Sequence, residues 1–352
     1  MKKQISIATA LVAASGFSYG EIKINENLSI EGFVTADYAV NENENNGISE
    51  SDNYFGVSEV EIDWLFNFDR VSGRIDLQHE DLNTSYESSG TLVEQAFMTY
   101  ELWDGGTLTA GRYASMLGYE DFERPGLHQY SFAHDLHDIN PGQNALDSTN
   151  IGITPGYNQG LKYTYDSNGN MFAVSLQDSI AGDDDRFGGD DNGSYGLEVA
   201  GSIQLAEGLR WFTGVAYQDS DQVNSEEDVV ANTYLAYESG PLTLGAELSH
   251  GIFDSGIAGV QVDIWQALLV ANYAYSESAS ITGRISYTEA GVDVAGTIIS
   301  NVFDAMKFTI AHNYAFTDNL ALVNEVSIVD SEDLAGDESE AVLGAASLVF
   351  TF

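Results

Sequence analysis

The side chains best suited to chemistry gather in one irregular stretch, residues 114–159, which shows neither a helical nor a strand period. Clustered histidines and carboxylates suit a divalent transition metal, but an irregular segment fixes no ligand geometry, so a polar internal lining is the simpler interpretation. Whether the acids or the histidines bind a metal stays open, and no metal ligand or cofactor is assigned. No nucleophile motif such as Gly-x-Ser-x-Gly occurs, so the sequence predicts no catalytic residue. The residues concerned are Glu120, Asp121, Glu123, Asp135, Asp138, Asp147, His128, His134 and His137.

The segments around this stretch alternate with a period of two. In the clearest example Val60, Ile62 and Trp64 share one face, and Glu61 and Asp63 share the other. Such alternation over about ten residues predicts a strand long enough to cross a bilayer when tilted. The pattern occurs near 28–38, 59–69, 71–80, 92–102, 107–113, 160–166, 171–180, 195–205, 209–218, 229–238, 242–250, 264–275, 280–288, 304–315, 320–329 and 341–352. The sequence therefore predicts an all-β protein, a transmembrane antiparallel barrel of about 16 strands, an even number as in single-chain bacterial barrels.

The connections between these segments alternate in length. Those after even-numbered strands are tight, such as 104–106 and 206–208, whereas those after odd-numbered strands are longer and acidic, such as 41–53 and 181–194. This asymmetry predicts short periplasmic turns and long extracellular loops. Aromatic residues mark the strand ends beside the short turns, as expected at a membrane interface. They are Phe66, Phe68, Tyr100, Tyr163, Tyr165, Tyr237, Tyr273, Tyr275, Tyr314, Phe350 and Phe352.

Composition and the N-terminus indicate export to the cell envelope. Lys2 and Lys3 precede an apolar run, and the small residues Ser18 and Gly20 suit a signal-peptidase cleavage site after Gly20. The sequence therefore predicts a secretory signal peptide over residues 1–20 and a mature barrel over 21–352. The chain has no cysteine and a net charge of −43. That charge argues against nucleic acid and anionic lipid headgroups as electrostatic partners.

Two parts of the sequence resemble Gram-negative outer-membrane porins. The chain ends on Phe352 in an alternating final strand, which is similar to the terminal signature of outer-membrane barrels. The segment Leu108-Thr-Ala-Gly-Arg-Tyr-Ala-Ser-Met-Leu-Gly-Tyr-Glu120, followed by Tyr130-Ser-Phe132, resembles the outer-membrane β-barrel porins that carry a "GRF…GYE" segment. The resemblance implies a homotrimer in the outer membrane, surrounded by its lipid. It also implies that the long loop after the fifth strand, about 114–159, folds inward as a constriction loop.

The resemblance further implies a charged constriction. In general porins an acidic loop opposes a basic cluster on the wall, which here predicts Glu120, Asp121, Glu123, Asp135 and Asp138 facing Arg74, Arg284 and Lys307. An inward bias of charges is required in any barrel, because a charge facing lipid costs about 2–4 kcal/mol. Charged side chains also set ion selectivity in pores. With such an excess of acid we expect a cation preference.

Two functional hypotheses remain at this point. In the first, the barrel is a water-filled channel, with no enzymatic activity, for passive diffusion of small hydrophilic solutes and ions. In the second, it is a non-channel surface or adhesive barrel, or a barrel hydrolase with active groups at its rim. The path of the long loop relative to the barrel axis is the observation that best separates them.

Overall fold

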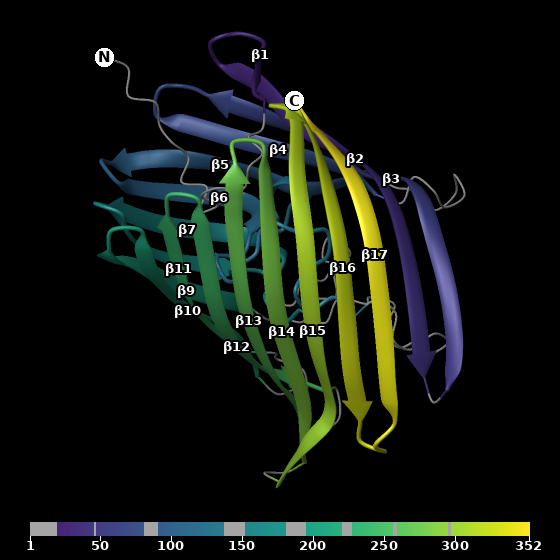
Figure 1. Cartoon of the computed structure of the whole chain (residues 1–352). Helices are drawn as coiled ribbons and strands as arrows, with labels where there is room; N and C mark the ends of the chain where they lie inside the picture. Colours follow the sequence, from purple (N-terminus) through teal and green to yellow (C-terminus); the bar gives the residue numbers. More distant parts are fainter. Residues whose placement is uncertain are drawn as a thin grey trace.

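The computed structural model describes residues 20–45, 47–80, 91–136, 152–180, 195–219, 227–255, 259–294 and 297–352. Nearly all of the chain outside the long loop forms strands, which Figure 1 shows curving around a common axis. The strands are β1 (Ile22–Lys23), β2 (Leu28–Asn45), β3 (Ile48–Asn67), β4 (Val71–Glu80), β5 (Thr91–Trp103), β6 (Gly106–Ala114), β7 (Tyr157–Ser167), β8 (Asn170–Gln177), β9 (Tyr195–Ala206), β10 (Leu209–Asp219), β11 (Asp228–Ser239), β12 (Leu242–Asp254), β13 (Val260–Ser276), β14 (Ala279–Val294), β15 (Thr297–Thr317), β16 (Leu320–Asp333) and β17 (Glu338–Thr351), with one short 3-10 helix, η1 (Arg124–Gly126).

The strands form one closed antiparallel barrel. Each of β2 to β17 pairs with its sequence neighbours, and β17 returns to β2, where Phe350 lies opposite Val34. The backbone of Gly32 and that of Phe352 exchange two hydrogen bonds at this seam. The short β1 also pairs with β2, just beyond the end of β17. The predicted barrel of 16 strands is confirmed, with β1 as an added element.

The hairpins at the predicted extracellular end differ from the prediction. Residues 41–53 were predicted to be a long loop, but β2 continues to Asn45 and β3 begins at Ile48, with ladder pairing up to the tip. In the same way β14 and β15 occupy most of 289–303. The β2–β3 tip is rich in Asn, Glu and Ser and lacks apolar alternation, because no lipid faces it. Backbone pairing alone extends the strands there, and the sequence pattern gives no sign of it.

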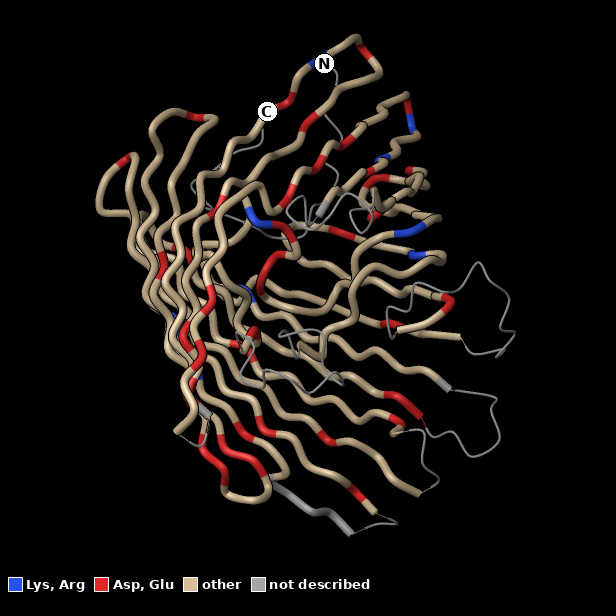
Figure 2. Tube along the Cα trace, turned by 90° about the vertical axis from the view of Figure 1, so that its right-hand side faces the viewer, with Lys and Arg blue, Asp and Glu red and all other residues tan. Residues whose placement is uncertain are grey.

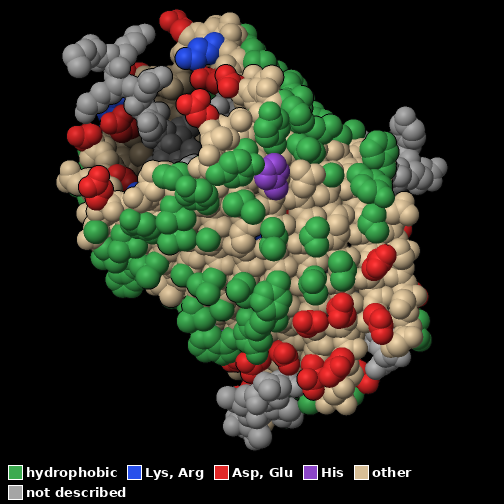
Figure 3. Space-filling view, viewed as in Figure 1, with side chains coloured by type: hydrophobic (Ala, Val, Ile, Leu, Met, Phe, Trp, Pro, Cys, Tyr) green, Lys and Arg blue, Asp and Glu red, His purple; other side chains and the backbone are tan. Residues whose placement is uncertain are grey.

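Alternation along the strands sets which side chains face the lumen. In β13 Gln266, Leu268 and Asn272 are buried, whereas Trp265 and Leu269 are exposed on the outer wall. In Figure 3 apolar side chains cover the upper and central wall, and acidic side chains crowd its lower end. The predicted aromatic belt is present on the outer surface near the short turns, with Tyr100, Tyr165, Tyr273, Tyr275, Tyr314 and Phe350 all exposed.

No helix of the described residues is both long and apolar enough to cross a membrane. Figure 2 shows acidic positions spread along the strands and at their ends, with few Lys and Arg positions among them.

Candidate functional site

Two glycines, one near the end of β6 and one at the start of the connection to β7, have backbone conformations that favour glycine. Gly111 has a φ of +131°, and a Cβ there would lie 2.2 Å from the carbonyl oxygen of Ala96. Gly118 has a φ of +107°, a conformation that side chains rarely adopt. Both lie in the segment that carries the porin resemblance. They shape the chain as it leaves β6 and brings Tyr119 and Glu120 into contact with the wall.

Glu120 joins three parts of this site. One of its oxygens accepts hydrogen bonds from Gln129 Nε2 and Arg284 Nη1, both at 2.7 Å, and the other accepts the Ala133 N–H at 2.8 Å. Gln129 and Ala133 belong to the loop itself, and Arg284 lies on β14. One carboxylate therefore closes a turn of the loop and ties it to the wall.

Two wall cations bind the loop backbone directly. Arg284 donates to the Ser131 carbonyl at 2.7 Å and to the Phe132 carbonyl at 3.1 Å, and its side chain is fully buried. Lys307, on β15, donates to the Phe132 carbonyl at 2.9 Å and to the Asp135 carbonyl at 2.8 Å. Both cations contact the loop directly, so they anchor it to the wall.

Wall carboxylates hold the loop by its backbone N–H groups. Glu198 accepts the N–H of Met116 at 2.7 Å, and Glu247 accepts that of Tyr119 at 2.8 Å. Glu325 accepts the N–H groups of both Tyr130 and Ser131, at 2.7 and 3.0 Å, and the Ser131 hydroxyl. The alternation of β9, β12 and β16 turns these three glutamates toward the lumen, and that alternation is the only sequence signal for them.

Apolar side chains also fasten the loop at two places. Leu117 and Ile153 pack with Phe212 and Val230 in a buried cluster against β9 to β11. Leu136 packs with Val329 and other small side chains of β15 to β17. The described part of the loop therefore contacts the inner wall from β9 round to β17.

The opposite wall is lined with acids. Arg74, on β4, forms ion pairs with Asp76 at 2.7 Å, Asp63 at 3.1 Å and Glu31 at 3.2 Å. Arg74 is thus neutralised by its own wall and forms no ion pair with the described part of the loop. We refer to Glu31, Glu59, Glu61, Asp63 and Asp76, which lie on β2, β3 and β4, as the acidic wall.

The tip of the loop reaches this acidic wall. Arg124 Nε lies 3.6 Å from a carboxylate oxygen of Glu59, and the Tyr157 hydroxyl, on β7, donates to Glu123 at 2.6 Å. Arg124 also lies over the Tyr130 ring. Because residues 117–136 contact β9 to β17 and residues 123–124 approach β3, the loop extends across the lumen.

The remaining predicted residues have different positions. Asp121 accepts a weak 3.4 Å bond from the Glu123 N–H, and burial raises the pKa of its carboxyl to about 6. Asp135 contributes its carbonyl to Lys307. Asp138 and His137 lie outside the described residues.

The two described histidines of the loop, His128 and His134, bond different wall residues and do not converge on a common metal position. The His128 carbonyl accepts bonds from Thr282 and Asn313, and His134 Nδ1 bonds to the Thr288 hydroxyl at 3.0 Å. Burial lowers the pKa of His128 to about 4. Burial, together with nearby Arg284 and Lys307, lowers that of His134 to about 3. The groups of potential metal ligands in the described part of the chain contain carboxylates only.

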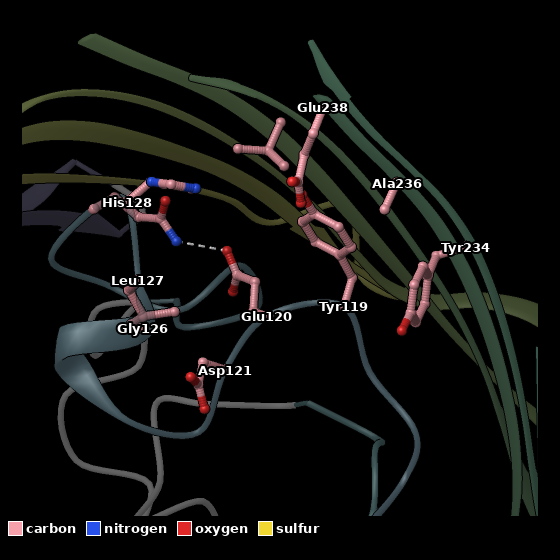
Figure 4. A pocket seen from close by; sticks show the side chains of 11 residues that line it. Tyr119, Glu120, Asp121, Gly126, Leu127, His128, Tyr234, Ala236 and Glu238 are labelled. Atoms are coloured by element: carbon pink, nitrogen blue, oxygen red, sulfur yellow. Dashed lines mark hydrogen bonds between the residues drawn. The ribbon is translucent and has the colours of Figure 1, made fainter. Parts of the chain in front are cut away.

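A small, partly open hollow lies between the loop and β11. Tyr119, Glu120 and Asp121 line it from the loop, and Tyr234 and Glu238 line it from β11. Figure 4 shows these aromatic rings and carboxylates on the two sides of the hollow. Acidic and aromatic groups suit a polar solute or a cation. Figure 3 shows an opening at the end of the barrel that carries the termini, with charged side chains around its rim.

Comparison with known proteins agrees with this architecture. A family model described as "Putative beta-barrel porin-2, OmpL-like" matches residues 148–352. No match was found among curated proteins.

Solved structures match over nearly the whole chain. The outer membrane channel DcaP of Acinetobacter baumannii has 14% identity and a TM-score of 0.65, covering 96% of this chain and 100% of its own. An anion-selective porin from Comamonas acidovorans has 13% identity and a TM-score of 0.62, covering 92% and 99%. OmpT, an outer membrane protein of Vibrio cholerae, has 10% identity and a TM-score of 0.61, covering 95% and 100%. At these identities the likeness shows the fold alone.

Proposed function

Because the chain belongs to the OmpL-like β-barrel porin-2 family and forms an outer-membrane barrel, we propose that it conducts small hydrophilic solutes and ions by passive diffusion, with a preference for cations. The resemblance to Gram-negative porins is confirmed by the family match. The observation that carries the proposal is the loop inside the barrel, held by Arg284, Lys307 and Glu325 from three strands. A barrel of about 16 strands leaves an aqueous channel unless something partly fills it.

The loop over 114–159 sets the width of the channel in this proposal. Its anchors are hydrogen bonds from buried side chains of β9, β12, β14, β15 and β16, so its position is fixed by many contacts. Solutes pass beside the loop. Polar and acidic groups such as Glu120 and Glu238 offer hydrogen bonds that replace part of the hydration shell of a passing solute. Of the predicted constriction residues, Arg284 and Lys307 hold the loop, and Arg74 organises the acidic wall.

The acidic wall supplies the cation preference. Two of its five carboxylates, those of Glu59 and Glu61, lie beside Glu123 of the loop tip, while Arg74 and Arg124 are the nearby cations. Carboxylates in excess attract cations and repel anions where the lumen is narrow. The carboxylates that are ionised at neutral pH set the sign of the electrostatic potential in the lumen.

Assembly and export complete the proposal. We propose a homotrimer, which the porin neighbours support. Native mass spectrometry of the detergent-extracted protein tests it, and a monomeric mass contradicts it. The signal peptide over 1–20 falls almost entirely outside the described residues. The sequence of the mature N-terminus tests that prediction.

Swelling of liposomes in small sugars tests the channel. We expect swelling with the intact protein, at rates that fall as the sugar grows, and faster entry of larger sugars after residues 122–146 are removed. The folded state of both proteins is checked by heat-modifiable mobility on gels. Absence of swelling by the folded intact protein contradicts a channel and favours a surface barrel with a filled lumen.

A further inference from the structure

Three carboxylates from two separate parts of the chain converge where the loop tip meets the acidic wall. Glu59 and Glu61 lie on β3, and Glu123 directly precedes η1 in the loop. One oxygen from each lies within 4.8 Å of the others. Glu61 also belongs to a second group of this kind with Asp63 and Asp76. Glu61 therefore lies between two neighbouring groups of acids.

The central carboxylate lacks a partner that would explain its burial. Glu61 has 0% of its surface exposed, and neither of its oxygens has a hydrogen-bond partner among the described residues. Its closest cation is Arg74, whose Nη2 lies 3.8 Å from one oxygen, beyond hydrogen-bond reach. Glu123 Oε2 is likewise buried without a hydrogen-bond partner. A buried carboxylate is stable only when it is paired, protonated or bound to a metal.

The neighbouring cations leave Glu61 without a close ion pair. Arg74 forms shorter ion pairs with Asp76, Asp63 and Glu31. Arg124 lies beside Glu59 and donates to the Tyr130 carbonyl. Gln78 Nε2 donates a hydrogen bond to Glu59 and the Tyr157 hydroxyl donates one to Glu123, which orients these two carboxylates.

We propose that Glu59, Glu61 and Glu123 bind a divalent cation of the calcium and magnesium class, which ties the loop tip to β3. All three ligands are hard oxygen donors, which such cations prefer over softer metals. Two ligands come from the rigid wall and one from the loop, so the ion is also a cross-link between them. Water and the adjacent Asp63 complete the coordination. Binding alone tests the site, so its failure is distinguishable from a failure of the proposed conduction.

Calcium binding to the purified protein tests the site. The protein in detergent is first depleted of metal with a chelator and then titrated with calcium at pH 7.5 by isothermal calorimetry, with magnesium in a second series. We expect one saturable site in the intact protein, weakened at least tenfold by Glu61→Gln and by Glu123→Gln. Glu26→Gln removes an exposed acid of the turn before β2 and serves as the matched control, with unchanged binding.

Thermal unfolding supplies the second readout. Calcium should raise the unfolding midpoint of the intact protein and of Glu26→Gln but leave that of Glu61→Gln unchanged. Diffuse attraction by the whole acidic surface would give the same calcium response in all three proteins and would overturn the proposal. A proton shared between Glu61 and Glu123 would give no saturable site in the intact protein, which also overturns it. If Glu61→Gln fails to fold, Glu123→Gln decides, because its change lies in the loop.

Discussion

Replacing Arg284 by leucine should release the loop from the wall. The guanidinium reaches Glu120, the Ser131 carbonyl and the Phe132 carbonyl, and it also bonds the hydroxyls of Ser131 and Thr309. Leucine makes none of these bonds and leaves the Glu120 carboxylate without its ion pair. Removing one partner of a buried ion pair costs about 3–5 kcal/mol. The equilibrium between held and released loop should therefore shift by between about a hundredfold and a few thousandfold.

Hydrogen exchange of the loop measures this release. The N–H groups of Tyr130 and Ser131 are bonded to Glu325 and exchange slowly while the loop is held. In Arg284→Leu we expect exchange in residues 119–136 to accelerate by roughly a hundredfold or more, in proportion to the released population. Single-channel conductance should rise in the same variant, because the lumen is wider when the loop is free.

Arg210→Leu provides the matched control. Arg210 is another arginine of the barrel strands, on β10, and it has no hydrogen bond or ion pair with the described part of the loop. Its replacement should leave loop exchange and conductance unchanged. If Arg284→Leu folds and its loop exchanges at the rate of the intact protein, the anchoring role derived for Arg284 is wrong. Equal acceleration in both variants would point to a general loosening of the barrel.

Two further predictions concern the backbone and pH. Gly111→Ala should lower the free energy of unfolding by about 1–3 kcal/mol, because φ at this position is +131° and the new Cβ would lie 2.2 Å from the Ala96 carbonyl oxygen. Gly283→Ala is the control, since its Cβ enters open space and the free energy of unfolding should stay nearly unchanged. Denaturant titrations measure both. Acidification from pH 7 to 5 should release the loop more in the intact protein than in His134→Gln, because the pKa of His134 is lowered to about 3 and its protonation then disfavours the held loop by about 2 kcal/mol. The carboxyl of Asp121, with a pKa raised to about 6, opposes release by about 1 kcal/mol in both proteins. Exchange rates are divided by the intrinsic amide rates, which themselves fall with pH, and an equal change of loop protection in the two proteins would contradict the role of His134.

The barrel was predictable from the sequence because lipid imposes alternation on every strand. Outward Ile62 and Trp64 beside inward Glu61 and Asp63 define β3 without any tertiary information. The same reasoning missed the outer ends of β2 and β3, where water faces both sides and no alternation is needed. Sequence patterns thus located the strands in the membrane and missed their extensions beyond it.

The contacts of the loop were far less predictable. Its inward path was expected only from the resemblance to porins, since an irregular segment has no period that fixes its direction. The pairing of Glu325 with Tyr130 and Ser131 joins residues that are almost 200 positions apart, and it depends on the register of β16. Glu61 and Glu123 meet for the same reason, through a strand and a loop that share no pattern. The alternation along each strand identifies which wall side chains point into the lumen. The register between neighbouring strands decides which loop residues these side chains meet.

The reversal potential in a planar bilayer tests the central claim most directly. The intact protein is inserted between solutions of potassium chloride that differ tenfold in concentration, and the zero-current voltage is read. We expect a conducting channel whose reversal potential has the sign of potassium preference, because carboxylates of the acidic wall and of the loop tip outnumber Arg74 and Arg124 beside them. A reversal potential of the chloride-selective sign, or folded protein that carries no current, would contradict the account.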